Sequence, residues 1–156
     1  MSDNKLIHTS HITIHKDRGP VRRAYIEGFE TPTIFGVHTN IKDFYGIEPE
    51  KEYPATLDYI IAGTGGGLTG TFGRALDVRG IQSAPDRLKA EVEGDINDVD
   101  GVLRITKIRV AYQLKYTDDQ YPKVKRAFNA HKEKCPAYMT VRDVVDFQVT
   151  LIQIDE

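Results

Sequence analysis

The chain has 156 residues, with 21 basic and 23 acidic side chains in even mixture and a formal net charge of −2. This balance leaves no strongly charged surface for nucleic acid or for an anionic membrane, so neither partner is expected. At this length a single domain over residues 1–156 is expected, able to bury roughly 70% of the surface that the unfolded chain exposes.

The sequence also indicates a compartment. It lacks an apolar run at its start and any stretch of about eighteen apolar residues, which argues against secretion and membrane spanning. Its single cysteine, Cys135, cannot form an intramolecular disulfide. We therefore expect a protein of the reducing cytoplasm, and we predict neither a metal nor a cofactor.

The N-terminal third predicts strands and turns. Alternating apolar residues predict strands over residues 5–15, 21–29 and 33–38, and the sequence DRGP at residues 17–20 predicts a turn between the first two. The polar and aromatic stretch of residues 40–53 is expected to be a loop.

Histidines and arginines surround this first turn. His8 lies on the opposite strand face from His11 and His15, and no cysteine or carboxylate shares their spacing, so a metal site is not predicted. Three arginines form either a solvated edge or a group that reaches an anionic or peroxidic ligand. They are Arg18, Arg22 and Arg23.

The longest stretch with helical spacing covers residues 56–80. Thr56 suits the N-cap, Asp58 lies in the first turn, and Gly80 suits the C-terminal cap. Six glycines inside this helix each cost about 1 kcal/mol relative to alanine. They are Gly63, Gly65, Gly66, Gly67, Gly70 and Gly73. We expect the rest of the protein to enclose such a helix, with the glycines marking close approach of backbone or ligand.

The same glycines permit a second interpretation. A short strand over residues 58–62, followed by Gly65, Gly67 and Gly70 as G-x-G-x-x-G, would match the dinucleotide-binding unit of an oxidoreductase. That fold needs a parallel strand after the helix and further strand–helix repeats. The segments that follow instead look like an antiparallel pair, which disfavours this interpretation.

The second half of the chain predicts a sheet. Residues 88–96 and 102–116 alternate as strands across a turn at residues 97–101, and the second strand is apolar on one face from Ile108 onward. Residues 147–154 alternate again and are expected to close the sheet.

One further helix is predicted between these strands, over residues 118–134. Its apolar stripe includes His131, which we expect to be packed rather than to act as a ligand. Strands, a glycine-rich helix, two strands, a helix and a last strand in this order predict an α+β fold.

Cys135 precedes Pro136, a residue favoured at the first helical position, so the thiol is expected at a helix N-cap. Backbone N–H groups there, together with Lys132 and Lys134, would favour thiolate over thiol. Cys135 is therefore either a reactive cysteine or a small buried apolar residue.

Together these segments resemble the OsmC/Ohr family of osmotically induced and organic-hydroperoxide-resistance proteins. The resemblance covers residues 20–154 and is most specific over residues 62–81, which contain LTGTFGRALDVRG, and residues 134–137, which contain CP. It implies an α+β, OsmC-like intertwined homodimer in which antiparallel β-sheets wrap around long central helices. Active sites would lie at the subunit interface.

The resemblance also implies a chemistry. Family members that act as thiol peroxidases use two cysteines, assisted by an arginine and an acidic residue. The first cysteine, on the central helix, attacks the peroxide and becomes a sulfenic acid. The second, in the CP element, condenses with it to a disulfide that a dithiol reductant reopens.

Carried over by position, Cys135 matches the second, resolving cysteine, and Asp58 falls where many relatives have a glutamate. Gly67 occupies the place of the peroxide-attacking cysteine. Because glycine has no nucleophile, the two-cysteine cycle cannot run in this chain. The assisting arginine is not assigned, and the candidates are Arg18, Arg22 and Arg23.

We therefore expect a member of this hydroperoxide-detoxification family with lost or altered peroxidase chemistry. It would keep an interface pocket beside Gly65, Gly66 and Gly67 for a small hydrophobic or peroxidic ligand. In the alternative, Cys135 alone acts as a one-cysteine, thiol-dependent scavenger of hydroperoxides or electrophiles. The residues leave open whether the chain is an enzyme.

Overall fold

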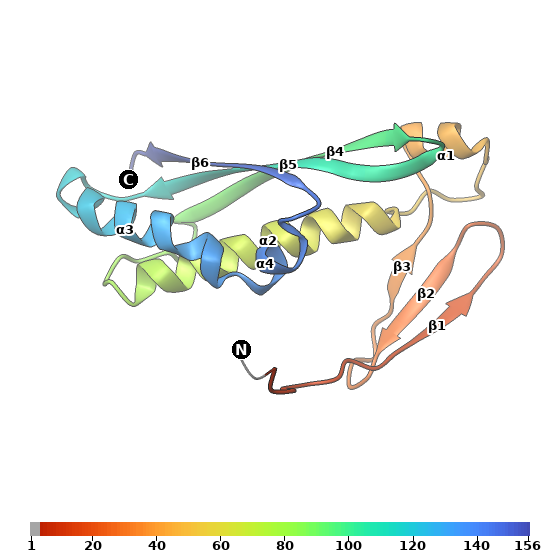
Figure 1. The fold of residues 1–156 in the computed structure, drawn as a ribbon, viewed down its shortest axis with the longest axis horizontal. Coiled ribbons are helices and arrows are strands. Elements are labelled where there is room, and N and C mark those ends of the chain that lie inside the picture. The colour runs from red at the N-terminus through yellow and green to blue at the C-terminus, as the bar shows by residue number, and fades with distance from the viewer. Residues whose placement is uncertain (1–3) are drawn as a thin grey trace. The chain divides into compact units, whose positions relative to one another are not determined.

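The chain folds into two units, Met1–Thr56 and Leu57–Glu156, in a computed structural model that describes residues 4–156. In the first unit, β1 (Ile12–Lys16), β2 (Arg22–Ile26) and β3 (Thr33–Phe35) form an antiparallel sheet in that order (Figure 1). The three predicted strands are confirmed, each shorter than predicted, and β1 ends one residue beyond its predicted end.

The loop predicted for residues 40–53 is wrong in part, because α1 (Thr39–Tyr45) is a helix. Gly46 ends it in the left-handed conformation, with φ 64°, and Ile47 N–H donates to the carbonyl of Lys42 at 3.0 Å. This Schellman arrangement satisfies carbonyls that the last turn leaves open. A helix of seven residues is too short to show a clear period in the sequence.

The glycine-rich helix is confirmed as α2 (Thr56–Asp77). Gly80 provides its C-terminal cap as predicted, in the left-handed conformation with φ 75°. The N–H of the next residue, Ile81, donates a hydrogen bond to the carbonyl of Leu76 at 3.0 Å. Thr56 is the first helical residue, and its hydroxyl accepts a hydrogen bond from Arg22 at 2.9 Å.

A second sheet holds β4 (Leu88–Val99), β5 (Val102–Lys115) and β6 (Asp146–Ile154) in that order. β4 and β5 are antiparallel, but β6 pairs with β5 in parallel, so the prediction of antiparallel sheets is wrong for this pair. The cause is the crossover between them: a parallel connection needs a dozen or more residues, and helices fill this one.

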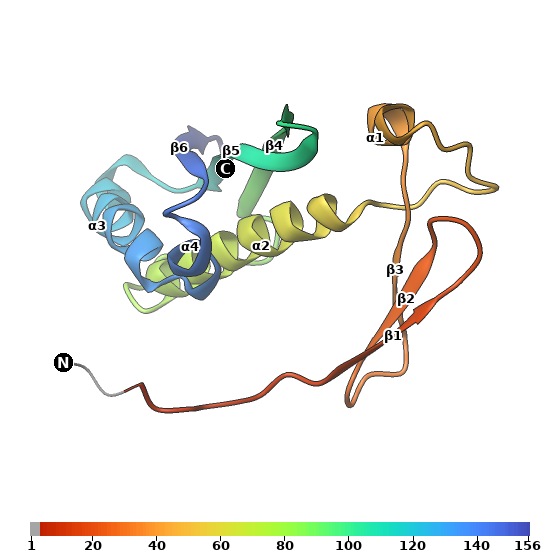
Figure 2. The ribbon, with the colours of Figure 1, turned by 45° about the vertical axis from the view of Figure 1, so that its right-hand side comes forward.

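The crossover holds four short helical elements. They are η1 (Asp118–Gln120), α3 (Tyr121–His131), η2 (Lys132–Lys134) and α4 (Pro136–Val141). Figures 1 and 2 show α2, α3 and α4 on the same face of the β4–β6 sheet. The other sheet face carries ion pairs, including Arg109 with Asp95 at 2.6 Å.

The core of this unit lies between the sheet and the helices. From α2 it takes Leu68, Phe72 and Leu76, all without exposed surface. From β5 it takes every second residue, as the alternation predicted: Ile108, Val110, Tyr112 and Leu114. Burial of these side chains, at about 25 cal/mol per Å² of apolar surface, fixes the position of α2 against the sheet.

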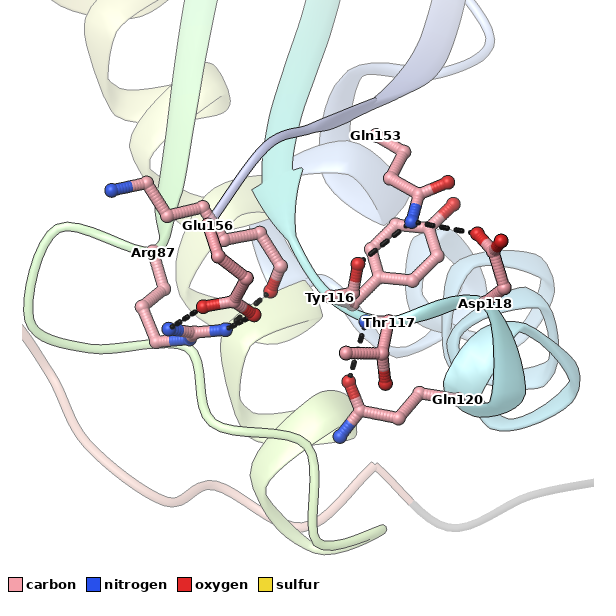
Figure 3. Close-up of polar contacts among 8 residues, drawn as sticks. Arg87, Tyr116, Thr117, Asp118, Gln120, Gln153 and Glu156 are labelled. Carbon is pink, nitrogen blue, oxygen red and sulfur yellow. Dashed lines mark hydrogen bonds and ion pairs between the residues drawn. The ribbon is translucent and has the colours of Figure 1, made fainter.

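Polar contacts hold the ends of the sheet (Figure 3). Arg87, just before β4, forms two hydrogen bonds with the carboxylate of Glu156 and donates to the carbonyl of Lys115 at 3.1 Å. Gln153 Nε2 donates to the carbonyl of Tyr116 at 2.7 Å, at the end of β5. These bonds tie the end of β6 to the strand that it joins in parallel.

The α+β class is therefore confirmed, with two sheets and helices gathered on one face of the larger sheet. Within residues 4–156, no helix has the length and apolar character needed to cross a membrane.

Candidate functional site

Cys135 lies at the N-cap of α4 because Pro136 begins that helix. Its backbone is extended, with φ −86° and ψ 115°, and its Sγ accepts a hydrogen bond from the N–H of Tyr138 at 3.4 Å. The predicted N-cap placement is confirmed. The thiol is completely buried, with 0% of the residue exposed.

Gly67 faces this sulfur from the neighbouring helix α2. A Cβ added at Gly67 would lie 3.3 Å from Cys135 Sγ and 3.1 Å from Ala137 Cβ. Standard bond lengths separate a Cβ from the far sulfur of a disulfide by roughly 3 Å. The two positions are 68 residues apart in sequence, yet the fold places them at the spacing of a cystine pair.

Two buried polar side chains lie near the thiol. Tyr112 on β5 and His131 on α3 share a hydrogen bond of 3.0 Å between the phenol oxygen and Nε2. His131 Nδ1 lies 2.6 Å from the carbonyl of Phe128, so Nδ1 carries the proton and Nε2 accepts from the Tyr112 hydroxyl. The expectation that His131 is packed is confirmed, since it is 1% exposed.

This buried pair is electrically neutral. Burial raises the pKa of Tyr112, and the nearby thiol of Cys135 adds to the rise. Burial lowers the pKa of His131. Sequence reasoning missed Tyr112, although a hydroxyl on an otherwise apolar strand face signals that a buried partner must exist.

Asp58 is not beside this sulfur. It lies in the first turn of α2, nine residues before Gly67, and a helix rises about 1.5 Å per residue. The two positions are therefore separated by about 13 Å along the helix axis. A joint role of Asp58 with Cys135 stays a prediction.

The three arginines near the first turn each have a partner within the first unit. Arg23 forms an ion pair with Asp17 at 2.6 Å, and Arg18 approaches Glu50 at 3.5 Å. Arg22 donates to the carbonyl of Pro20 and to Thr56. Which of them serves a peroxide stays undecided.

The three glycines predicted to line a pocket divide between two surfaces. Gly65 and Gly66 line an open groove of about 800 Å³ between α2 and β4, together with Leu88 and Val92, whereas Gly67 faces Cys135. Successive helical residues are about 100° apart, so neighbouring glycines point to different neighbours.

The dinucleotide interpretation is wrong about its strand. Residues 58–62 are helical, and Gly65, Gly67 and Gly70 lie within the same continuous helix. A phosphate-binding turn between a strand and a helix is therefore missing from this segment. Within residues 4–156, no three His, Cys, Asp or Glu side chains gather as a metal-binding group.

Comparison with known proteins agrees with this fold. The model of a family described as OsmC-like protein matches residues 49–150 of the chain. The chain belongs to the OsmC-like family. A search of curated proteins found no match.

Solved structures with the same fold as this OsmC-like protein come from several bacteria. A hypothetical protein from Aquifex aeolicus is 8% identical with a TM-score of 0.71, and an OsmC-like protein from Mycoplasma pneumoniae is 14% identical with a TM-score of 0.71. Each match covers 96% of this chain and 99% of the other. The organic hydroperoxide resistance protein OhrB of Bacillus subtilis is 18% identical with a TM-score of 0.64, covering 93% and 98%.

Proposed function

We propose that this OsmC-like protein has lost two-cysteine peroxidase chemistry and binds a small hydrophobic or peroxidic ligand at the interface of a homodimer. The observation that carries the proposal is the contact between Gly67 and Cys135. A side chain at residue 67 would extend from α2 toward Cys135 Sγ, and its Cβ would lie 3.3 Å from that sulfur. The geometry of a cysteine pair is thus present with one sulfur missing.

The chemistry of the lost step follows from atom balance. Peroxide cleavage transfers one oxygen to a thiolate, and the sulfenic acid then loses water as the second thiol forms the disulfide. With one cysteine in the chain, no intramolecular disulfide can form. The remaining thiol is also enclosed, and a buried thiol is poorly placed to meet a peroxide. This burial argues against the one-cysteine scavenger.

Restoring the sulfur tests the proposal. Gly67→Cys should form a disulfide with Cys135 under cumene hydroperoxide and should gain dithiol-dependent peroxide consumption that the unchanged protein lacks. Contact with Ala137 at 3.1 Å is tighter than ordinary packing, so the double variant Gly67→Cys/Ala137→Gly provides a relaxed version.

Ala62→Cys is the matched control. It adds a thiol at an exposed position on α2, about 140° around the helix from residue 67, and should form no disulfide with Cys135. Failure of both Gly67 variants to form the disulfide would overturn the assignment of residue 67. Turnover by the unchanged protein that Cys135→Ser abolishes would favour the scavenger instead.

Two surfaces support the homodimer. On the exposed face of α2, a Cβ at Gly63, Gly66 or Gly70 would touch nothing within 4 Å, so no contact in the described chain explains these glycines. In addition, Ile12 and Ile14 of β1 are exposed apolar residues on the first sheet. A second copy that approaches the glycine face and covers the apolar sheet would account for both.

The ligand pocket is proposed at the groove that Gly65 and Gly66 line. It combines an apolar wall, Leu88 and Val92, with flat glycine surface that lets a ligand or a second copy approach the helix backbone. Equilibrium sedimentation tests the dimer separately from the chemistry of residue 67.

A further inference from the structure

A second cleft adjoins this groove within the second unit, and the two share Gly70, Arg74 and Val78 of the α2 region in their linings. It has a volume of about 470 Å³ and runs between the C-terminal half of α2 and the C-terminal end of α3. This volume is in the range of about 300–1,000 Å³ that small-molecule sites occupy. The cleft is therefore large enough to take a ligand.

Three cations line this cleft, and no acidic residue does. Arg74 and Arg79 come from the end of α2 and the turn that follows, and Lys134 comes from η2. Within the part of the chain that the structure describes, none of the three has a carboxylate at ion-pair distance. No ion pair therefore neutralises these three cations, and the carboxylate of Asp77 lines the adjoining groove rather than this cleft.

Three other arginines of the same unit do form ion pairs. Arg87 pairs with Glu156, Arg109 pairs with Asp95 and Glu93, and Arg142 pairs with Glu133 at 2.9 Å. A chain with a net charge of −2 has enough carboxylates to neutralise its cations. Other cations of this unit, such as Arg104 and Arg126, also lack an ion pair among the described residues, so what distinguishes the three cleft cations is that they line one cavity.

The dipole of α2 explains only part of this arrangement. Cations near a helix C-terminus are stabilised by the dipole, which accounts for Arg74 and Arg79. Lys134 belongs to a different element, and it lines the same cavity from the other side. Like charges that converge on one cavity repel each other unless an anion lies between them.

Arg79 is already oriented. Its Nη1 donates to the carbonyl of Ala75 at 2.9 Å, and the guanidinium has five N–H donors in all. The remaining donors can form the paired bonds that arginine makes with a carboxylate or phosphate. Apolar side chains complete the lining: Ala75, Val78 and Ala130.

We infer that this cleft binds an amphipathic organic anion, with a carboxylate or phosphate head group held by Arg74, Arg79 and Lys134 and an apolar body against Ala75, Val78 and Ala130. The cations supply attraction and orientation, and the apolar lining excludes water from the body of the ligand. The site is separate from the sulfur of Cys135 and does not depend on peroxidase chemistry.

Calorimetric titration of the full chain with octanoate and octyl phosphate tests the inference. Both anions should bind, more weakly as salt is added, and octyltrimethylammonium, a cation with the same chain, should not. The tighter of the two anions identifies the head group. Binding of the cation as tight as that of the anions would overturn the inference. Inorganic phosphate that binds as tightly as octyl phosphate would overturn the role of the apolar lining.

Variants locate the site. Arg74→Gln, Arg79→Gln and Lys134→Gln should each weaken octanoate binding about three- to tenfold. Since Arg79 also bonds Ala75, the exposed Lys134 gives the variant that leaves the fold unchanged. Arg126→Gln, an exposed cation of α3 outside the cleft, should have no effect. Equal binding by Lys134→Gln and by the unchanged protein, or no binding of either anion, would refute the site.

Discussion

The packing of α2 against β4 is tested by alanine substitution at two buried glycines of the same helix. A Cβ at Gly65 would lie 2.7 Å and 3.0 Å from the two methyl carbons of Val92. A Cβ at Gly73 would meet Ser83 and Leu88 at 3.5 Å and 3.7 Å, which is ordinary packing. Gly65→Ala and Gly73→Ala therefore add the same methyl group, at a crowded site in the first case and at a site with room for it in the second.

The magnitudes follow from two opposing effects. Both changes gain about 1 kcal/mol of helix propensity. Gly65→Ala also overpacks the site, at a cost of about 1–3 kcal/mol, because the β-branched Val92 has little freedom to rotate away. We expect Gly73→Ala to raise the free energy of unfolding by about 1 kcal/mol and Gly65→Ala to leave it unchanged or lower it by up to about 2 kcal/mol.

Urea unfolding followed by circular dichroism measures both variants at one fixed protein concentration, because the proposed dimerisation would make stability depend on concentration. Adding Val92→Ala to Gly65→Ala removes the clashing methyl groups, so the double-mutant cycle should show favourable coupling of at least about 1 kcal/mol. Equal stability of Gly65→Ala and Gly73→Ala, or a coupling near zero, would refute this account of the α2–β4 contact.

Three further predictions concern pH, the buried polar pair and the proposed dimer. Burial lowers the pKa of His131, so the folded state resists protonation of this side chain, and the stability of the protein should fall as the pH drops below the unfolded pKa of about 6.5. In thermal melting, His131→Asn should not show this loss of stability at low pH, whereas the exposed-site control His8→Asn should still show it. Tyr112→Phe leaves His131 Nε2 without its donor and should lower the unfolding free energy by about 1–3 kcal/mol, measured by urea titration; an unchanged midpoint would contradict the hydrogen bond. If the proposed dimer forms through this face of α2, Gly66→Leu should convert it to monomer in equilibrium sedimentation, while Lys125→Leu at an exposed position of α3 should not. A dimer that Gly66→Leu leaves intact would place the interface elsewhere.

Much of the fold could be predicted from local sequence patterns. The spacing of leucines and Phe72 predicted α2 despite its glycines, and the cap at Gly80 could be assigned from residue type alone. Burial along β5 follows the alternation in the sequence, since one face of that strand meets the helices. These features depend on periods of two and 3.6 residues, which a single sequence displays directly.

Pairings between distant segments could not be obtained in this way. The parallel direction of β6 depends on where the crossover returns the chain, and the sequence of residues 147–154 does not indicate that direction. The bond between Tyr112 and His131 joins β5 to α3, so each side chain alone shows only that it needs a partner. The approach of Gly67 to Cys135 was accessible only through the family resemblance.

The glycine at position 67 governs packing as well as chemistry. Cys135 and Ala137 approach α2 so closely that any side chain at residue 67 would push α4 outward by a few tenths of an ångström. Glycine therefore allows α4 to pack at its present distance, and at that distance Cys135 has no exposed surface. The absence of a side chain at residue 67 and the enclosure of the remaining thiol are thus two consequences of one residue. For this reason Gly67→Cys should change the exposure of Cys135 to thiol reagents as well as its disulfide chemistry, whereas Gly73→Ala, which fits its space, should change neither.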